Sequence, residues 1–160
     1  MLTQKEITYL KENLDAEYLC IRKYEQYAAL STDADVKNMF TTLAGYEQQH
    51  ATTLKNILTQ NGVNYTSIYE SYNKPSSAQN QQNLSFSDAQ LMNDSLSTEK
   101  HVSSNYNTAI LETVDTNIRK QLQHIQQEEQ GHAETIFNMM RTKGYYKDRI
   151  SWHCQLILSL

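Results

Sequence analysis

Two Glu-x-x-His tetrapeptides, separated by 82 residues, constrain the fold of this chain more than any other feature of its sequence. The first copy contains Glu47 and His50, and the second contains Glu129 and His132. Residues at positions i and i+3 lie on one face of an α-helix, so the glutamate and histidine of each copy can reach a common region from one rigid segment. We therefore expect each copy on a helix that directs ionisable side chains into the protein.

A third glutamate precedes each copy by 30 residues, at Glu17 before the first copy and at Glu99 before the second. These side chains stand in apolar stripes, where an unpaired ionised carboxylate costs several kcal/mol. Two divalent cations would balance the four negative charges, and two neutral imidazoles would complete the ligand set. A single Glu-x-x-His would be an ordinary part of a solvated helix face, but the matched copies predict a buried metal site divided between two half-chains.

Helical periodicity of apolar residues extends through four long segments. The capping signals that precede these segments are Thr3 with Glu6, Asp33, Ser87 with Gln90, and Asp115. The chain contains only 4 Gly and 1 Pro, which are too few for the many turns of a sheet protein. The sequence therefore predicts an all-α fold. We interpret it as two copies of one helical hairpin, the first over about residues 3–62 and the second over about residues 87–144.

The segment between the hairpins, about residues 63–86, breaks the helical pattern. It is rich in Ser, Asn and Gln and contains Pro75, with scattered anchors at Tyr65, Ile68, Tyr69 and Tyr72. Short turns at 31–33 and 113–115 make each hairpin antiparallel, and a long crossover makes the second and third long helices parallel, as in a ferritin-like four-helix bundle. We interpret residues 1–160 as one domain, in which residues 145–160 form an apolar tail or short helix that caps the bundle or provides an interface.

Composition excludes several classes of partner. The net charge of −4 and the absence of a Lys/Arg cluster argue against nucleic acid. No apolar run approaches the roughly 20 residues that span a bilayer, and no hydrophobic leader opens the chain. Cys20 and Cys154 are too few for a disulfide framework, which favours a reducing compartment and structural thiols. We therefore expect a cytoplasmic protein, or one made inside a cell that later encloses it, with no membrane partner.

The repeated residues resemble the ligand set of the ferritin-like carboxylate-bridged dinuclear metal proteins, which include ferritins, bacterioferritins and rubrerythrins. The resemblance implies two bridging glutamates, Glu47 and Glu129, with terminal ligands Glu17 and His50 on one metal and Glu99 and His132 on the other. Iron is the expected metal and manganese the alternative. The resemblance also suggests a homodimer.

Other positions refine this resemblance. Tyr24 and Tyr106, each seven residues after a terminal glutamate, match family tyrosines that hydrogen-bond to carboxylate ligands, although packing in an amphipathic core is an equal alternative. Cys20 and Val102 stand where rubrerythrins carry an extra carboxylate, and the chain has no Cys-x-x-Cys pair. A simple six-ligand site, closer to that of bacterioferritin, is therefore expected rather than a rubrerythrin with built-in electron transfer.

Three minor expectations concern residues other than the repeated glutamates and histidines. Gly131 lies within the last long helix, where it is expected to mark close packing or room beside the metals. Glu128 is assigned to a solvated helix face, with an extension of the polar shell as the alternative. His101, His124 and His153 fall outside the repeated pattern and are assigned surface or structural roles.

A more local resemblance covers about residues 87–147. The stretch from Ser97 through Glu99 and Tyr106, together with Phe137-Asn138-Met139-Met140 and Lys143-Gly144-Tyr145-Tyr146, is similar to the coat-F domain of spore coat proteins in endospore-forming Firmicutes. That family implies a ferritin-like fold and spore-coat proteins as partners. Some of its members are purely structural.

Three functional hypotheses follow from the sequence. The first is an oxidoreductase whose dinuclear iron or manganese centre reacts with dioxygen or peroxide. The second is a structural spore-coat or storage-related protein in which metal mainly stabilises the bundle. The third is a helical interaction module without metal. Metal analysis separates the first two from the third, and metal-dependent peroxide consumption separates the first from the second.

Overall fold

The computed structural model describes residues 1–73 and 85–146, and these ranges contain five α-helices. The four long helices are α1 (Gln4–Leu30), α2 (Ala34–Gln60), α4 (Asp88–Glu112) and α5 (Thr116–Thr142), and the short α3 (Thr66–Asn73) lies between the hairpins. The fold is all-α, as the sequence predicts. Residues 74–84 of the predicted crossover and residues 147–160 of the predicted tail, with His153 and Cys154, lie outside the described residues.

The predicted helix boundaries are confirmed by their capping contacts. Thr3 and Glu6 form a reciprocal capping box at the start of α1, and Ser87 and Gln90 form the same arrangement at the start of α4. The side chains of Asp33 and Asp115 accept hydrogen bonds from backbone N–H groups in the first turns of α2 and α5. Gly62 and Gly144 follow the ends of α2 and α5 with φ of 70° and 73°, a conformation that favours glycine. Local side-chain chemistry thus sets where each long helix begins, and a glycine follows the ends of α2 and α5.

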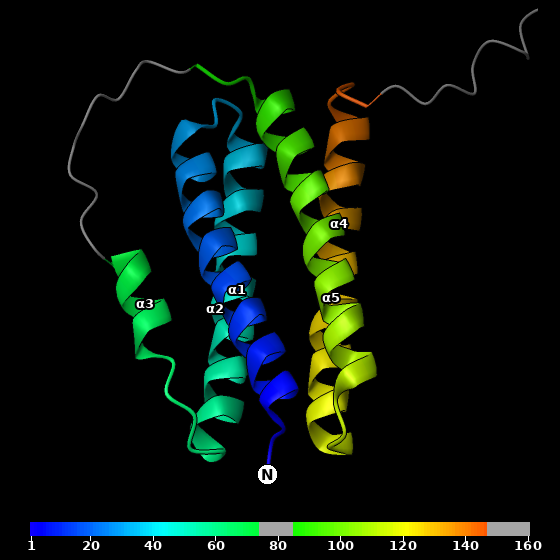
Figure 1. Ribbon diagram of the computed structural model, residues 1–160. Coiled ribbons are helices and arrows are strands. Elements are labelled where there is room, and N and C mark those ends of the chain that lie inside the picture. Colours follow the sequence, from blue (N-terminus) through cyan, green and yellow to red (C-terminus); the bar gives the residue numbers. More distant parts are fainter. Residues whose placement is uncertain (74–84, 147–160) are drawn as a thin grey trace, which may run out of the picture.

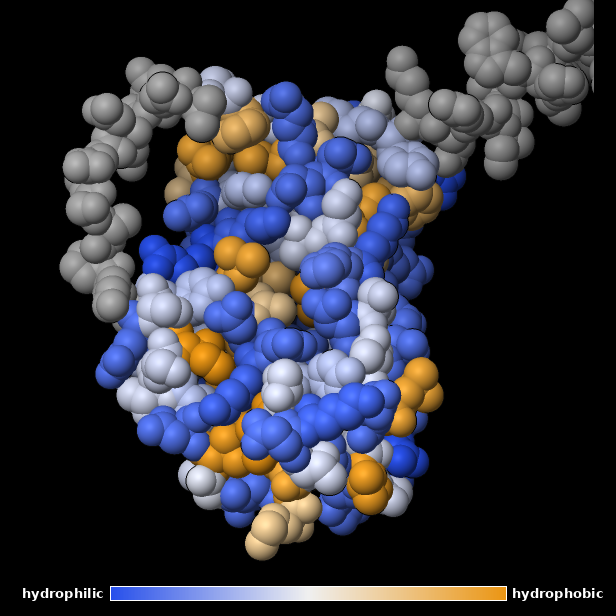
Figure 2. Space-filling view, viewed as in Figure 1, coloured by the Kyte–Doolittle hydropathy of each residue, from blue (hydrophilic) through white to orange (hydrophobic). Residues whose placement is uncertain are grey.

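The long helices form two antiparallel hairpins that pack side by side (Figure 1). In this view α1 runs upward, α2 and α4 run downward, and α5 runs upward. The second and third long helices are therefore parallel, as predicted. Helix α1 also contacts α4, and α2 also contacts α5. Apolar side chains from all four helices fill the interior, among them Leu14, Phe40, Leu54, Met92 and Leu122. The face shown in Figure 2 is mainly hydrophilic, with hydrophobic residues in small scattered groups.

Helix α3 differs from the prediction of an irregular crossover. Its side chains pack against α1, where the ring of Tyr18 lies 5.8 Å from that of Tyr69 and 5.7 Å from that of Tyr72. The Asn64 side chain accepts a hydrogen bond of 2.8 Å from the backbone N–H of Thr66 at the start of the helix. Packing against α1 stabilises this short helix, which its eight residues could not maintain alone. The predicted anchoring role of these tyrosines is confirmed.

Two buried carboxylates connect the hairpins reciprocally. Glu6, at the start of α1, accepts a hydrogen bond of 2.8 Å from the backbone N–H of Val114 in the α4–α5 turn. Asp88, at the start of α4, accepts one of 3.0 Å from the backbone N–H of Thr32 in the α1–α2 turn. Both carboxylates are almost completely buried. Each hairpin therefore binds the turn of the other. These contacts fix the axial register of the two hairpins, which determines which residues of the two halves lie opposite each other.

Replacement of Glu6 by glutamine should lower the stability of the fold at neutral pH more than in acid. Burial raises the pKa of Glu6, but hydrogen bonds from the Thr3 backbone, the Val114 backbone and the Thr3 hydroxyl outweigh burial and hold this pKa below its ordinary value of 4.5. The unfolded chain therefore binds this proton first as pH falls, so the stabilisation by ionised Glu6 is present above pH 4.5 and is lost at lower pH.

Urea denaturation of wild type and Glu6→Gln checks this expectation. A buried charge-assisted contact of this kind contributes about 1–3 kcal/mol, which should separate the two proteins near neutral pH. The separation should shrink toward zero in acid. Glu25→Gln, which alters an exposed glutamate of the same helix, is the matched control. A difference in unfolding free energy that is independent of pH would contradict the role assigned to the ionised Glu6 carboxylate.

Candidate metal centre

All six repeated Glu and His residues are buried in the middle of the bundle. Their exposed fractions run from 0% to 6%, for Glu17, Glu47, His50, Glu99, Glu129 and His132. Each belongs to an inward-facing stripe: His50 stands seven residues after Leu43 and four before Leu54, and His132 stands seven after Ile125 and four before Ile136. The apolar spacing that builds the core therefore also turns these polar side chains inward.

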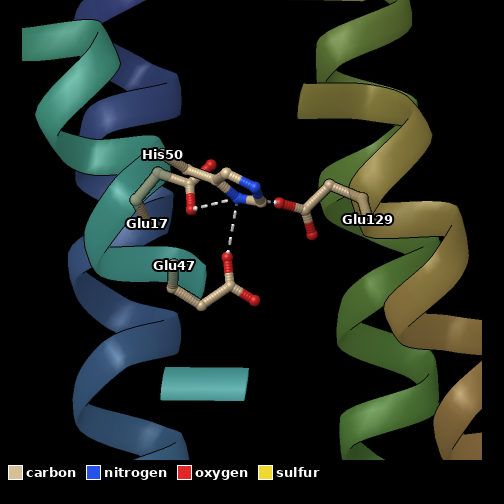
Figure 3. A group of neighbouring side chains, drawn as sticks. All are labelled: Glu17, Glu47, His50 and Glu129. Carbon is tan, nitrogen blue, oxygen red and sulfur yellow. Dashed lines mark hydrogen bonds and ion pairs between the residues drawn. The ribbon is translucent and has the colours of Figure 1, made fainter. Parts of the chain in front are cut away.

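The first group of side chains surrounds Nδ1 of His50 (Figure 3). This atom lies 2.9 Å from Oε1 of Glu129, 3.1 Å from Oε2 of Glu47 and 3.5 Å from Oε2 of Glu17. The four residues come from α1, α2 and α5, and Figure 3 shows their side chains converging on one point. Because one N–H can donate to only one of these oxygens, hydrogen bonding alone does not explain why three carboxylates converge here.

The second group surrounds Nδ1 of His132. This atom lies 3.2 Å from Oε1 of Glu47, 3.8 Å from Oε2 of Glu99 and 4.0 Å from Oε2 of Glu129. In each of the two groups, the potential ligand atoms all lie within 4.8 Å of one another. Glu47 and Glu129 belong to both groups. In each of them, one oxygen lies nearer His50 and the other nearer His132. The two groups of potential ligands are therefore adjacent and share two carboxylates.

The donor set fits cations because buried oxygens of the site lack other partners. Within the part of the chain that the structure describes, six buried atoms of these residues have no hydrogen-bond partner: Oε2 of Glu17, Oε1 of Glu47, Oε2 of Glu99, both oxygens of Glu129, and Nδ1 of His132. A buried polar atom without a partner is strongly destabilising, and a carboxylate more so. Metal coordination would satisfy all six.

Burial also perturbs the acidity of the site. Desolvation raises the pKa of Glu17 to about 8 and that of Glu99 to about 9, and neighbouring carboxylates add to both shifts. Desolvation likewise raises the pKa of Glu129 to about 7. Burial lowers the pKa of His50, but the neighbouring carboxylates of Glu129, Glu17 and Glu47 outweigh burial and raise this pKa. Without metal, the site therefore disfavours four ionised carboxylates, and a protonated His50 is the cation that the protein itself can supply.

Two tyrosines bind the terminal glutamates crosswise between the hairpins. The hydroxyl of Tyr24 in α1 donates to Oε1 of Glu99 in α4, and the hydroxyl of Tyr106 in α4 donates to Oε1 of Glu17 in α1. The hydrogen bonds that the family resemblance implies are thus present, and the structure adds that each one joins opposite hairpins. In both glutamates Oε1 is held by a tyrosine while Oε2 faces the site, which leaves one oxygen free for a cation.

Sequence reasoning underestimated two residues that contact the histidines. Oε2 of Glu128 lies 3.1 Å from Nε2 of His50, so its assignment to a solvated face was wrong and the alternative, an extended polar shell, is correct. The ring of Tyr46 lies 5.3 Å from that of His132 and was not singled out. Both residues stand four positions before a histidine, one turn earlier on the same helix. That spacing could have indicated that both residues lie near a histidine. It would have suggested the wrong histidine, however, because each residue contacts the one on the other helix.

Three further expectations can be compared with the structure. Close packing at Gly131 was wrong, because the residue is exposed and no atom lies within 4 Å of an added Cβ. His101 and His124 are exposed, as predicted. Cys20 is buried, and burial raises the pKa of its thiol, which fits a structural role.

Comparisons with known proteins agree with this architecture. Residues 87–149 match the Coat F domain, which covers α4 and α5. No curated protein is similar enough in sequence to match the chain. Among the described residues, no helix combines the length and hydrophobicity needed to cross a membrane.

Solved structures share the fold at low sequence identity. A putative spore coat protein from Bacillus halodurans has a TM-score of 0.78 and 14% identity, with 92% of each chain covered. The dodecameric thioferritin of Bacteroides fragilis, a bacterioferritin-related protein, has a TM-score of 0.68 and 20% identity, covering 91% of this chain and 92% of its own. A two-domain protein from Anabaena variabilis with DJ-1/ThiJ/PfpI-like and ferritin-like domains has a TM-score of 0.68 and 14% identity, covering 91% of this chain and 38% of its own. The fold is therefore that of a ferritin-like bundle.

Proposed function

We propose that this ferritin-like chain, whose second hairpin matches the Coat F domain, holds a dinuclear transition-metal centre and uses it for redox chemistry with dioxygen or peroxide. One observation carries the proposal: Glu47 and Glu129 are shared by two groups of four potential ligands, and Oε1 of Glu47 and both oxygens of Glu129 are buried without a hydrogen-bond partner. We further propose that the hairpins are copies of one unit, which the matched positions at an offset of 82 residues support.

Charge balance supports two cations rather than one. Four ionised carboxylates carry a charge of −4, which two divalent ions neutralise while both imidazoles remain neutral ligands. Carboxylate oxygens and imidazole nitrogens suit iron and manganese as ligands. Among the described residues, neither group of potential ligands includes a thiolate, which disfavours softer metals. Iron is the proposed metal, and manganese is the alternative.

The residues of the chain would position and isolate the metals. Tyr24 and Tyr106 fix the terminal glutamates, and Glu128 orients the His50 ring by accepting from its Nε2–H, so that Nδ1 faces the site. The near-complete burial of the ligands keeps most of the site away from bulk water. When bound, iron or manganese would supply the electron transfer, cycling between divalent and trivalent states that carboxylates stabilise through their charge.

Peroxide and dioxygen consumption by metal-loaded protein test the redox part of this proposal. Wild-type protein loaded with Fe²⁺ or Mn²⁺ should consume peroxide or dioxygen faster than the same free metal in buffer. Glu129→Gln preserves the size of a shared ligand but removes its charge, and it should abolish the difference. Glu134→Gln, an exposed change on the same helix, should have no effect. Equal rates of peroxide or dioxygen consumption by wild type and Glu129→Gln would contradict the redox proposal.

A structural spore-coat role is the second candidate, because the Coat F match favours it specifically. In this case metal would stabilise the bundle without turnover, and other spore-coat proteins would be the partners. Metal-dependent stability without consumption of peroxide or dioxygen would favour this role. A fluorescent fusion located in the coat rather than the cytoplasm of sporulating cells would support it further.

The proposed assembly is a homodimer, which light scattering of the purified protein tests.

A further inference from the structure

The ligands and tyrosines related by an offset of 82 make equivalent contacts in the centre, but residues next to them differ between the two halves. Tyr24 and Tyr106 exchange equivalent hydrogen bonds with the terminal glutamates, and the two histidines face equivalent groups of carboxylates. The main difference occurs at positions 46 and 128, which are tyrosine in α2 and glutamate in α5. Because these positions contact opposite histidines, the two halves of the centre have different surroundings.

The His50 half is held by a carboxylate. Oε2 of Glu128 lies 3.1 Å from Nε2 of His50, and Nε2 of His124 lies 3.4 Å from the same oxygen. A carboxylate on the far nitrogen of a metal-binding imidazole fixes its tautomer and orientation and increases its basicity as a ligand. The His50 side chain is only 3% exposed. In this half of the centre, His50 is therefore both a more basic ligand and almost completely shielded from solvent.

The His132 half lies beside a surface pocket instead. Tyr46 takes the position equivalent to Glu128, and its ring lies against the ring of His132 without supplying a carboxylate. Thr42 takes the position equivalent to His124. Thr42, Tyr46, His132, Thr135 and Met139 help to line a pocket of about 440 Å³ between α2 and α5. Solvent and small solutes can therefore approach His132 from this groove.

We propose that the two metal positions are not equivalent, and that the one held by His132 exchanges through the Tyr46 pocket while the one held by His50 is retained. The inference rests on the proposed dinuclear centre. Its physical basis is twofold: the His50 position has the additional carboxylate of Glu128, and the His132 position has the pocket. Glu128 acts as a positioning residue for His50, and the exposed ring of Tyr46 limits the rate at which solutes reach His132.

Removal of Co²⁺ by EDTA, followed by stopped-flow absorbance of the cobalt-loaded protein, tests the inference. Wild type should lose its two ions in two phases of equal amplitude. Glu128→Gln should accelerate the slow phase by about 10–100-fold, the usual effect of losing such a partner, and leave the fast phase unchanged. Tyr46→Ala should accelerate the fast phase alone. Tyr46→Glu, alone or with Thr42→His, transfers the Glu128 and His124 arrangement to the other half and should slow the fast phase.

The controls separate this inference from the proposal on which it rests. Glu134→Gln removes one exposed negative charge from α5 and should leave both phases unchanged. Release in a single phase, or two phases that Glu128→Gln and Tyr46→Glu leave unaltered, would overturn the inference while leaving the dinuclear centre intact. Failure of the wild type to bind a pair of cobalt ions would instead overturn the proposed function. Since Tyr46 and Glu128 are both partly exposed, these substitutions leave the core intact.

Discussion

Alanine at Glu47 or at Glu129 should reduce the metal content of the purified protein from about two ions per chain to nearly none, because each of these residues serves both groups of ligands. Alanine at Glu17 or at Glu99 should have a smaller effect, because each of these belongs to only one group. We expect these two variants to retain about one ion per chain, since three ligands of the affected position and all four of the other remain. The contrast between shared and terminal glutamates is the specific signature of a bridged pair.

Elemental analysis of protein purified without chelator measures this contrast. Glu25→Ala, at an exposed position of α1, should keep the wild-type metal content. Equal losses at all four buried glutamates would indicate a single ion rather than a pair. Unchanged metal content in the Glu47→Ala and Glu129→Ala variants would show that any bound metal lies elsewhere.

Metal loading should raise the thermal stability of the protein strongly, because the metal-free centre is electrostatically unfavourable. Burial raises the pKa of Glu17 to about 8 and that of Glu99 to about 9, which expresses how poorly the metal-free interior tolerates their charge. A ligand that binds only the folded state at about 100 times its Kd stabilises that state by about 2.7 kcal/mol. For a chain of this length, that corresponds to a rise in Tm of about 5–11 °C.

The double variant Glu47→Gln/Glu129→Gln provides the matched comparison. It retains the shape of the shared residues but removes two buried charges, so the metal-free variant should melt at or above the Tm of metal-free wild type. Added metal should then leave its Tm unchanged. Calorimetry with and without metal measures both effects. An equal rise in Tm for wild type and variant on metal addition would refute the idea that the buried centre is the source of the stabilisation.

Much of the fold was predictable because its signals are local. Thr3, Asp33, Ser87 and Asp115 cap helices through contacts within a few residues, so the sequence alone indicates where each helix begins. The placement of the six Glu and His residues followed from helical periodicity and from the repeated spacing. Both kinds of pattern can be recognised without knowing how the helices pack.

Features that depend on packing between helices were not predictable in the same way. Helix α3 exists because Tyr18 of α1 offers a surface for it, and its own sequence resembles a loop. The crosswise pairing of Tyr24 with Glu99 joins residues of opposite hairpins, and spacing alone does not reveal which glutamate a tyrosine reaches. Glu128 was misassigned for the same reason: it lies at the edge of the solvated face of α5 and contacts His50 only because α2 and α5 approach each other.

Anomalous scattering from crystals of the metal-loaded protein tests the central claim most directly. The account predicts two peaks about 3.5–4 Å apart, the usual separation in a two-metal site. Both should lie between Glu47 and Glu129, with one peak beside Glu17 and His50 and the other beside Glu99 and His132. A single peak at the centre of the bundle, or peaks only at the protein surface, would contradict it.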